Sequence, residues 1–203
     1  MSLTPIKKPI SVRGDDSKDK LGLIHVITGD GKGKTTSSLG LALRAVGNNL
    51  RVHIVQFLKS GFTGELYSAK KLGFEVEQFG VDAIKERQEK LEQFKDKTGR
   101  FIFQPDDMEK DAARQGWEYA KKAILSGDFD MIIMDEINCV LEKNLIPIED
   151  VLEVIRNHGK VELVFTGRDA PKDLIEAADY VNVIHGIKHP WQKGIVARKG
   201  IEY

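Results

Sequence analysis

The sequence has little that would mark a secreted, membrane-spanning or nucleic-acid-binding protein. Its one cysteine, Cys139, allows no disulfide within the chain, and a reducing compartment, by default the cytoplasm, is expected. Lysine plus arginine and aspartate plus glutamate both number 31, so charge gives no reason to expect nucleic acid or an anionic membrane as a partner. No apolar stretch approaches the roughly 20 residues that cross a bilayer, and the N-terminus lacks the apolar core of a signal peptide.

What is present fits a globular protein with one sizeable core. A chain of 203 residues suits a single domain, which we place at residues 22–203. Residues 1–21 are polar and basic, and we expect them to form a flexible arm, with a flap over an anionic ligand as a second role.

The most informative stretch is residues 24–36, which read Ile-His-Val-Ile-Thr-Gly-Asp-Gly-Lys-Gly-Lys-Thr-Thr. The apolar start predicts a strand, the closely spaced glycines predict a tight turn whose N–H groups converge on an anion, and the threonines open a helix. Lys34 can reach the terminal phosphates of a nucleotide, and the Thr35 hydroxyl can ligate Mg²⁺. We therefore predict a phosphate-binding loop formed by Thr28, Gly29, Asp30, Gly31, Lys32, Gly33, Lys34, Thr35 and Thr36.

The loop departs from the usual pattern at one position. In Gly-x-x-x-x-Gly-Lys-[Ser/Thr] the first glycine would fall on Thr28, but the glycine comes one residue later, at Gly29. This shift suggests that the nucleotide lies differently from its pose in an ordinary ATPase. The alternative is a glycine-rich strand-to-helix turn that binds nothing.

Polar residues follow two further predicted strands. Asp135 and Glu136 end the apolar run 131–134, and Arg168 follows the run 161–165. Adjacent carboxylates at the end of a buried strand are costly unless they serve a cation, so with the phosphate loop they predict a Mg²⁺-nucleotide site. The alternative is a helix N-terminus capped by acids.

Strands and helices alternate along the chain. This pattern predicts an α/β fold of the RecA-like P-loop NTPase kind, a mostly parallel sheet with helices on both faces, whose ligands bind at the carboxyl edge. The expected strands are 24–27, 52–57, 74–79, 131–134, 161–165 and 180–184, and the expected helices follow the loop and cover 65–72, 82–98, 107–126, 148–157 and 171–177. Apolar residues at helical spacing predict two inward faces, one with Leu39, Ala42, Leu43 and Val46 and the other with Met108, Ala112, Trp117, Ala120 and Ile124.

Three candidates are ambiguous from pattern alone. Arg44, on the helix after the loop, suits a surface or packing role, although it could reach a ribose. Phe101 and Phe103 suit either a buried strand end or an exposed contact for a ligand, with burial favoured.

Four features in order give the sequence a family resemblance. They are the loop Thr28–Thr36, the pair Asp135-Glu136, Thr166-Gly-Arg168, and the tail 187–203 with Lys188-His189, Trp191 and Gly200-Ile-Glu-Tyr203. Together, from about Leu23 onward, they resemble the ATP:corrinoid adenosyltransferases of the cobalamin-biosynthesis type with a P-loop. The charged segment 82–98 is longer than usual in that family, Asp30 stands where Asn is frequent, and Trp191 stands where Phe is frequent.

The resemblance implies transfer of the 5′-deoxyadenosyl group of ATP to the cobalt of a reduced corrinoid, cob(I)alamin or cob(I)yrinic acid a,c-diamide, with release of triphosphate. It implies a nucleotide reversed in its loop, Lys34 and Glu136 as catalytic residues, and Mg²⁺ held by Thr35 and Glu136, with Asp135 behind them. Arg44 and Arg168 would contact ATP, Phe101 and Phe103 would displace the lower ligand of the corrinoid, and the protein would be a homodimer served by an electron-transfer reductase. The rival hypotheses are a P-loop kinase or ATP hydrolase acting on the β–γ bond, and a nucleotide-binding regulator without turnover.

Overall fold

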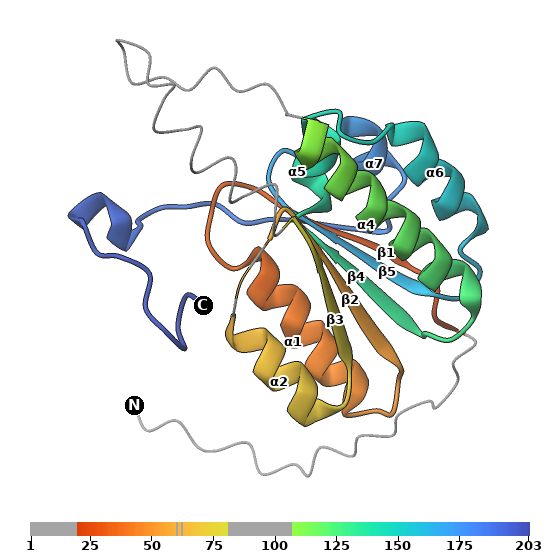
Figure 1. Cartoon of the computed structure of the whole chain (residues 1–203), viewed down its shortest axis with the longest axis horizontal. Helices are drawn as coiled ribbons and strands as arrows, with labels where there is room; N and C mark the ends of the chain where they lie inside the picture. The colour runs from red at the N-terminus through yellow and green to blue at the C-terminus, as the bar shows by residue number, and fades with distance from the viewer. Residues whose placement is uncertain (1–19, 60, 62, 81–106) are drawn as a thin grey trace, which may run out of the picture.

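A six-stranded sheet forms the centre of the molecule (Figure 1). The computed structural model describes residues 20–59, 61, 63–80 and 107–203. Strand order is β3-β2-β4-β5-β1-β6, and all pairings are parallel. The strands are β1 (Ile24–Thr28), β2 (Val52–Phe57), β3 (Glu75–Phe79), β4 (Met131–Asp135), β5 (Glu162–Thr166) and β6 (Tyr180–Val183).

Helices cover both faces of this sheet (Figure 1). Apolar side chains of the first two helices pack on one face, and those of the later four pack on the other. The helices are α1 (Lys34–Val46), α2 (Gly64–Leu72), α4 (Asp107–Ser126), α5 (Ile137–Glu142), α6 (Ile148–Asn157) and α7 (Lys172–Glu176), followed by the 3₁₀ helix η2 (Pro190–Lys193). The predicted α/β class with a parallel sheet covered on both sides is therefore confirmed, and no helix in the described ranges is long and apolar enough to cross a membrane.

Burial explains why the central strands were the easiest to predict. Every residue of β2, β4 and β5 is buried, as expected for strands covered by helices on both faces. The edge strands β3 and β6 have no buried residue. The short helices α5 and η2 were not predicted, because each is too short to show a helical period.

Two predicted apolar faces need correction. On α4 the buried stripe includes Ala113, Trp117, Ala120 and Ile124, whereas Met108, placed on this face by the sequence, is 38% exposed. On α1, Leu43 was expected to face the core and is also exposed. In both cases a neighbouring small or polar residue, Glu109 or Ala42, occupies the inward position.

Some predictions fall outside the described residues. They are most of the arm (1–19), the charged helix at 82–98 and the aromatic pair Phe101 and Phe103.

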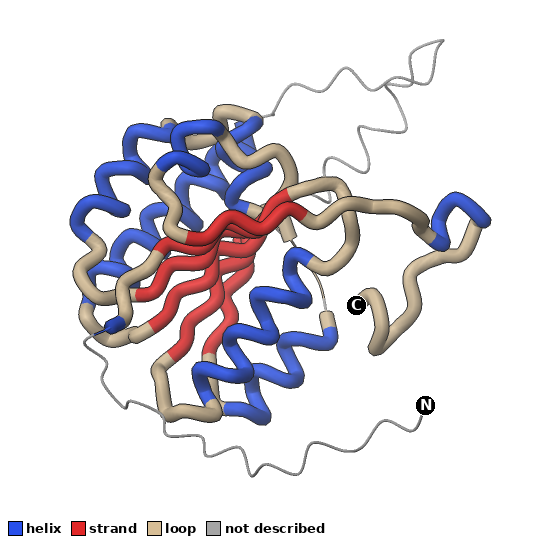
Figure 2. Tube along the Cα trace, turned by 180° about the vertical axis from the view of Figure 1, so that it is seen from behind, coloured by secondary structure: helices blue, strands red, loops and turns tan. Residues whose placement is uncertain are grey.

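The order of the strands decides what meets at the carboxyl edge. The segment 29–33 joins β1 to α1, while β4 ends at Asp135 and β5 is followed by Arg168. β5 lies between β1 and β4, so all three ends are neighbours. Figure 2 shows the chain after β6 leaving the sheet and turning back, which brings the C-terminus near the start of α2, where Tyr203 approaches Gly64.

Candidate functional site

The end of β6 fixes the shape of the loop. Gly29 has a φ of 108°, and a Cβ there would meet the Ile184 carbonyl oxygen at 2.4 Å. A Cβ on Gly31 would lie 2.7 Å from the His185 carbonyl carbon, while the Gly31 N–H donates to Ile184 O at 2.8 Å. The glycines are therefore required because a neighbouring backbone passes against the loop, in addition to their freedom to turn.

Lys34 is held inside its own loop. Its side chain is in the first turn of α1, and Nζ donates to the carbonyl oxygens of Gly29 and Gly31, each at 2.8 Å. The residue is only 8% exposed. In this structure the two carbonyl oxygens compensate the charge of the Lys34 ammonium. A bound polyphosphate would take their place as its hydrogen-bond partner.

Asp135 is the most deeply buried acid at the carboxyl edge, at 1% exposure. Its Oδ1 accepts from Thr35 Oγ1 at 2.9 Å and from Thr166 Oγ1 at 2.6 Å. Its Oδ2 accepts from Gln56 Nε2 at 3.0 Å and from Lys59 Nζ at 2.5 Å. Four donors from four different elements or loops thus fix this carboxylate, which is a suitable position from which to orient Thr35.

Glu136 sits in a strained backbone conformation. It has a φ of 66° as the N-cap of α5, its N–H donates to Thr166 Oγ1 at 3.1 Å, and its side chain makes no cap hydrogen bond. Such a conformation costs about 1–3 kcal/mol in a non-glycine residue and is typical of functional sites. Glu136 also lines the cavity described below.

The thiol beside Glu136 is not suited to nucleophilic chemistry. Cys139 Sγ donates to Glu136 Oε2 at 3.2 Å. Burial, helped by the neighbouring carboxylate, raises the pKa of the Cys139 thiol to about 11. The side chain stays protonated at neutral pH, and the site therefore has no thiolate here.

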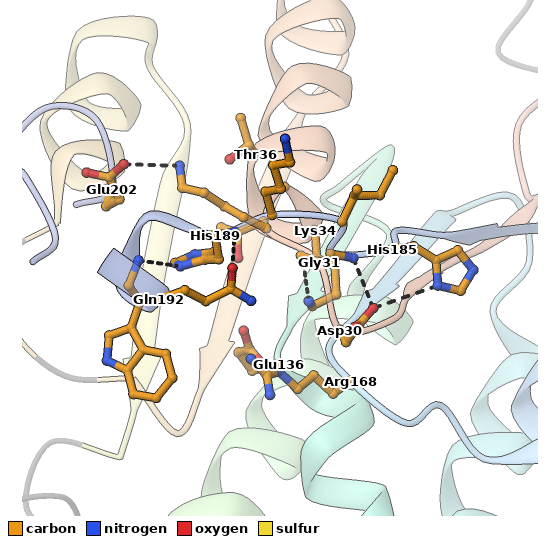
Figure 3. A pocket seen from close by; sticks show the side chains of 17 residues that line it. Asp30, Gly31, Lys34, Thr36, Glu136, Arg168, His185, His189, Gln192 and Glu202 are labelled. Atoms are coloured by element: carbon orange, nitrogen blue, oxygen red, sulfur yellow. Dashed lines mark hydrogen bonds and ion pairs between the residues drawn. The ribbon is translucent and has the colours of Figure 1, made fainter. Parts of the chain in front are cut away.

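A cavity of about 1040 Å³ opens where the loop, the Asp-Glu strand end and the tail meet. Figure 3 shows Glu136 and Arg168 together on one side of it, with His189, Gln192 and Glu202 from the tail on another. The volume is at the upper end of the range usual for small-molecule sites. The lining includes Asp30, Gly31, Lys32, Gly33, Lys34, Thr35, Thr36, Glu136, Arg168, His185, Lys188, His189, Trp191, Gln192 and Glu202.

The tail is joined to the loop by polar contacts. The Gly186 N–H donates to Asp30 Oδ1 at 3.2 Å, and this bond, with the nearby His185, holds the pKa of Asp30 below its usual value. Lys32 Nζ donates to Ile201 O at 3.4 Å and lies 3.9 Å from Glu202 Oε1. Hydrogen bonds from Arg198 lower the pKa of Glu202 to about 2, so an anion faces Lys32 at neutral pH.

The structure brings most of the predicted residues together. The loop from Asp30 to Thr36, Glu136 and Arg168 line the cavity. Thr28 and Asp135 lie behind it, where Thr28 Oγ1 accepts from the Ala170 N–H at 3.2 Å. Gly29 contributes its turn and its carbonyl to Lys34.

Arg44 is not brought to the other candidates. It is exposed in the last turn of α1, ten residues beyond Lys34, which is about 15 Å along a helix axis. Phe101 and Phe103 lie outside the described residues.

Sequence reasoning missed the partners of Asp135 and much of the tail. Gln56 is a polar residue in the otherwise apolar central part of β2, and Lys59 follows the carboxyl end of that strand. The signal at Gln56 was readable, because a buried amide needs partners. The position of Lys59 after this strand indicated the ligand-binding edge but did not identify its partners. The cavity-lining roles of His185, His189, Gln192 and Glu202 had no signal except the tail pattern.

The oxygen donors at the strand end suit Mg²⁺, which prefers hydroxyl, carboxylate and phosphate ligands. Thr35 Oγ1 and the Asp135 carboxylate already hold one cation between them, the Lys59 ammonium. No group of three or more His, Cys, Asp or Glu side chains gathers within the described part of the chain, so the phosphates of a nucleotide would have to complete the coordination.

Comparison with known proteins agrees with this geometry. A family model described as ATP:corrinoid adenosyltransferase BtuR/CobO/CobP matches residues 20–203. The chain belongs to this family. The corrinoid adenosyltransferase of Escherichia coli strain K12 is 32% identical over 203 residues, covering 98% of this chain and 94% of that protein. The corrinoid adenosyltransferase CobA of Salmonella typhimurium is 30% identical over 202 residues with the same coverage, and that of a Sinorhizobium species is 34% identical over 191 residues, covering 91% and 82%.

Solved structures show more distant likeness to this adenosyltransferase-family chain. The RadB recombinase aligns with a TM-score of 0.43 and 15% identity, covering 84% of this chain and 77% of RadB. Domain III of the Thermotoga maritima replication initiation protein DnaA aligns with a TM-score of 0.40 and 13% identity, covering 81% and 55%.

Proposed function

We propose that this protein transfers the 5′-deoxyadenosyl group of ATP to the cobalt of a reduced corrinoid, cob(I)alamin or a cob(I)yrinic acid a,c-diamide, and releases triphosphate. The family relationship supports this reaction. The observation that carries it is the shared cavity, which is lined by both the predicted phosphate-binding loop and the family-like tail. A nucleotide held there by its phosphates can present its sugar to a second substrate.

In this reaction the protein itself forms no covalent bond with either substrate. The electron pair of Co(I) attacks C5′ of the ribose, a Co–C bond forms, and the C5′–O bond breaks with its electrons passing to the departing triphosphate. The metal of the corrinoid is itself the nucleophile, so no activated serine or cysteine is needed. The protein must align C5′ with the cobalt and stabilise the charge that grows on the leaving group.

The cavity wall offers the groups for that second task. Lys34, Lys32 and the N–H groups at the start of α1 would receive the polyphosphate, and Arg168 supplies a further cation from the β5 edge. Thr35 and Glu136 would hold Mg²⁺, with Asp135 orienting Thr35 from behind. When bound, Mg²⁺ neutralises charge on phosphate oxygens.

Four further points belong to the same proposal. Phe101 and Phe103 displace the lower corrinoid ligand, a reductase supplies the electron that generates Co(I), the protein is a homodimer, and it works in the cytoplasm. The first is tested by Phe101→Ala and Phe103→Ala, which should slow adenosylation with cob(II)alamin plus reductase more than with chemically reduced cob(I)alamin. Sedimentation tests the dimer.

The direct test mixes the protein with Mg-ATP and chemically reduced cobalamin, and follows the corrinoid spectrum and triphosphate release. Adenosylcobalamin and triphosphate in equal amounts are expected. ADP or phosphate as the sole nucleotide product would favour the kinase or hydrolase alternative. ATP binding by folded protein without any product would favour a regulator.

Lys34→Ala sharpens this test. We expect turnover to fall by about 10²–10³-fold, as when a charge-stabilising donor is removed, with little loss of folding because Lys34 bonds only its own loop. Lys172→Ala is the matched control, because that lysine is exposed and pairs only within α7. A large stability loss in Lys34→Ala with normal turnover per folded molecule would contradict the assignment.

A further inference from the structure

Lys59 occupies a position that its place in the sequence does not reveal. It follows β2, after Leu58, whose φ of 54° turns the chain at the strand end. Gly80, at the end of β3, makes room for this turn, since a Cβ there would lie 2.9 Å from Leu58 Cα. The turn carries the Lys59 ammonium across the sheet edge to Asp135, where Nζ lies 2.5 Å from Oδ2.

Among the four donors to the Asp135 carboxylate, Lys59 alone is charged. Thr35, Thr166 and Gln56 offer neutral groups. Gln56 is itself fixed, because Gln78 Nε2 donates to its carbonyl oxygen at 2.9 Å. A buried carboxylate is costly without a compensating charge, so the Lys59 ammonium supplies what the neutral donors do not.

The same ammonium also bonds the predicted metal ligand. Lys59 Nζ lies 3.2 Å from Thr35 Oγ1, so it touches both Thr35 and Asp135. Mg²⁺ binds oxygen at about 2.0–2.1 Å, and an ion on Thr35 Oγ1 would therefore stand against the ammonium. Two cations this close repel strongly in a site of low dielectric.

We propose that Lys59 is the resident counter-cation of the metal site, and that it must leave Thr35 and Asp135 before a divalent ion can bind. The proposal rests on the Mg²⁺ site of the proposed function. It makes Lys59 a positioning residue: in the metal-free protein it holds Thr35 and Asp135 in place, and its departure accompanies metal loading.

A second ion pair serves as the control. Lys143 Nζ lies 2.9 Å from Glu109 Oε1, and its side chain is 24% exposed, the same fraction as that of Lys59. The acids are also alike, with side chains 5% and 1% exposed. Neither Lys143 nor Glu109 lines the cavity. The two pairs are thus alike in the exposure of their side chains, and the Lys59 pair includes a residue of the predicted metal site.

The first experiment titrates the full chain, saturated with ATP and free of corrinoid, with Mn²⁺ and follows the Mn²⁺ that is not bound to the protein by electron paramagnetic resonance. Lys59→Met should bind Mn²⁺ about tenfold more tightly than the wild type, because no charge-assisted bond must be broken. Lys143→Met should match the wild type. Unchanged or weaker binding in Lys59→Met would overturn the proposal, and so would the absence of Mn²⁺ binding in both proteins.

The second experiment needs no variant and is therefore independent of folding defects. Reductive methylation of wild-type protein, read residue by residue by mass spectrometry, should label Lys59 faster with ATP and saturating Mg²⁺ than with ATP alone, while labelling of Lys143 stays constant. A Lys59 rate that does not respond to Mg²⁺ would overturn the proposal. Both readouts are separate from adenosyl transfer, so a failure of the proposed function is told apart from a failure of this inference.

Discussion

Glu136 combines backbone strain with a position on the cavity wall. Its left-handed φ of 66° is unfavourable for any residue with a Cβ. Its side chain makes no capping hydrogen bond with helix α5 that would compensate this cost. Its carboxylate lines the cavity beside Arg168 (Figure 3). Stability and function therefore make opposite demands at this position.

Replacing Glu136 should separate these two demands. Glu136→Gly is expected to keep or raise the free energy of unfolding, by up to about 1 kcal/mol, because glycine adopts positive φ without penalty. Turnover should be largely lost, since the cavity loses its carboxylate. Urea unfolding and the adenosylation assay measure the two effects, and Glu136→Gln, which keeps the strain, is the control. A loss of more than about 2 kcal/mol in Glu136→Gly would contradict this reading.

His53 makes stability sensitive to acid. It is fully buried in β2 against Phe129 and Tyr119, and among the described residues neither ring nitrogen has a hydrogen-bond partner. Burial lowers the pKa of His53, although Glu75 opposes the shift. As the pH falls through the ordinary pKa of 6.5, this histidine binds a proton in the unfolded chain but not in the native chain. The free energy of unfolding therefore falls.

His53→Phe should remove this contribution. One proton per molecule gives a slope of at most about 1.4 kcal/mol per pH unit below the unfolded pKa. Urea unfolding at pH 7.5 and 5.5 should show a smaller loss of stability on acidification in the variant than in the wild type. Equal losses would assign the acid sensitivity to other groups.

For single residues, a role could be predicted from the sequence where it depends on the local pattern of neighbouring residues. The loop glycines, Lys34 and the Asp135-Glu136 pair were readable, because strand, loop and helix are contiguous there or because two acids end an apolar run. Lys59 was not, since its partners come from α1 and β4 and only the strand order brings them together. Arg44 is exposed in the last turn of α1, in agreement with the surface role that its pattern favoured.

Among the elements, α4 lies unusually close to the sheet at one point. A Cβ on Gly116 would meet Phe57 Cε1 at 2.9 Å and Phe79 Cγ at 3.0 Å. This glycine therefore sets the separation between α4 and strands β2 and β3. Gly40 on α1 offers the opposite case, with nothing within 4 Å of an added Cβ.

The two helical glycines should respond to alanine with opposite signs. Gly40→Ala should stabilise the protein by about 0.5–1 kcal/mol through helix propensity. Gly116→Ala should destabilise it by about 1–3 kcal/mol despite the same propensity gain, because aromatic rings must shift. Thermal and urea unfolding of both variants test the pair, and a stabilised Gly116→Ala would show that α4 can move outward at little cost.

Element boundaries were predicted best where the sequence pattern changes sharply at both ends. The bounds of β2 and α6 agree with the structure to the residue, since the first is an apolar run between polar turns and the second has strong amphipathic spacing. The inward face of α4 was shifted, because Glu109 and Gly116 take positions that an apolar pattern assigns to larger residues. The short helix α5 begins after the turn at Glu136, and no hydrophobic periodicity in the sequence indicates that turn.

At the scale of the whole molecule, the tail lines the cavity and contributes little to the hydrophobic core. After Ile184, every tail residue except Glu202 is exposed. Deleting residues 187–203 should therefore change the melting temperature by only about 2–4 °C, the effect of about 1 kcal/mol in a chain of this size, while abolishing adenosyl transfer. Calorimetry and the adenosylation assay measure both, and a collapse of the fold would show that the tail holds the sheet together.

The place of β1 between β5 and β6 has a consequence for biosynthesis. Ile27 pairs with Thr166 on one side and Asn182 on the other, so the strand that carries the phosphate loop has no lateral partner until the last strands exist. Such distant pairings form late and slowly. A nascent chain that has exposed residues 24–36 to solvent, but not yet residues 180–184, consequently has no assembled cradle. The loop is therefore expected to bind a nucleotide only after residues 180–184 have been synthesised and have paired with β1.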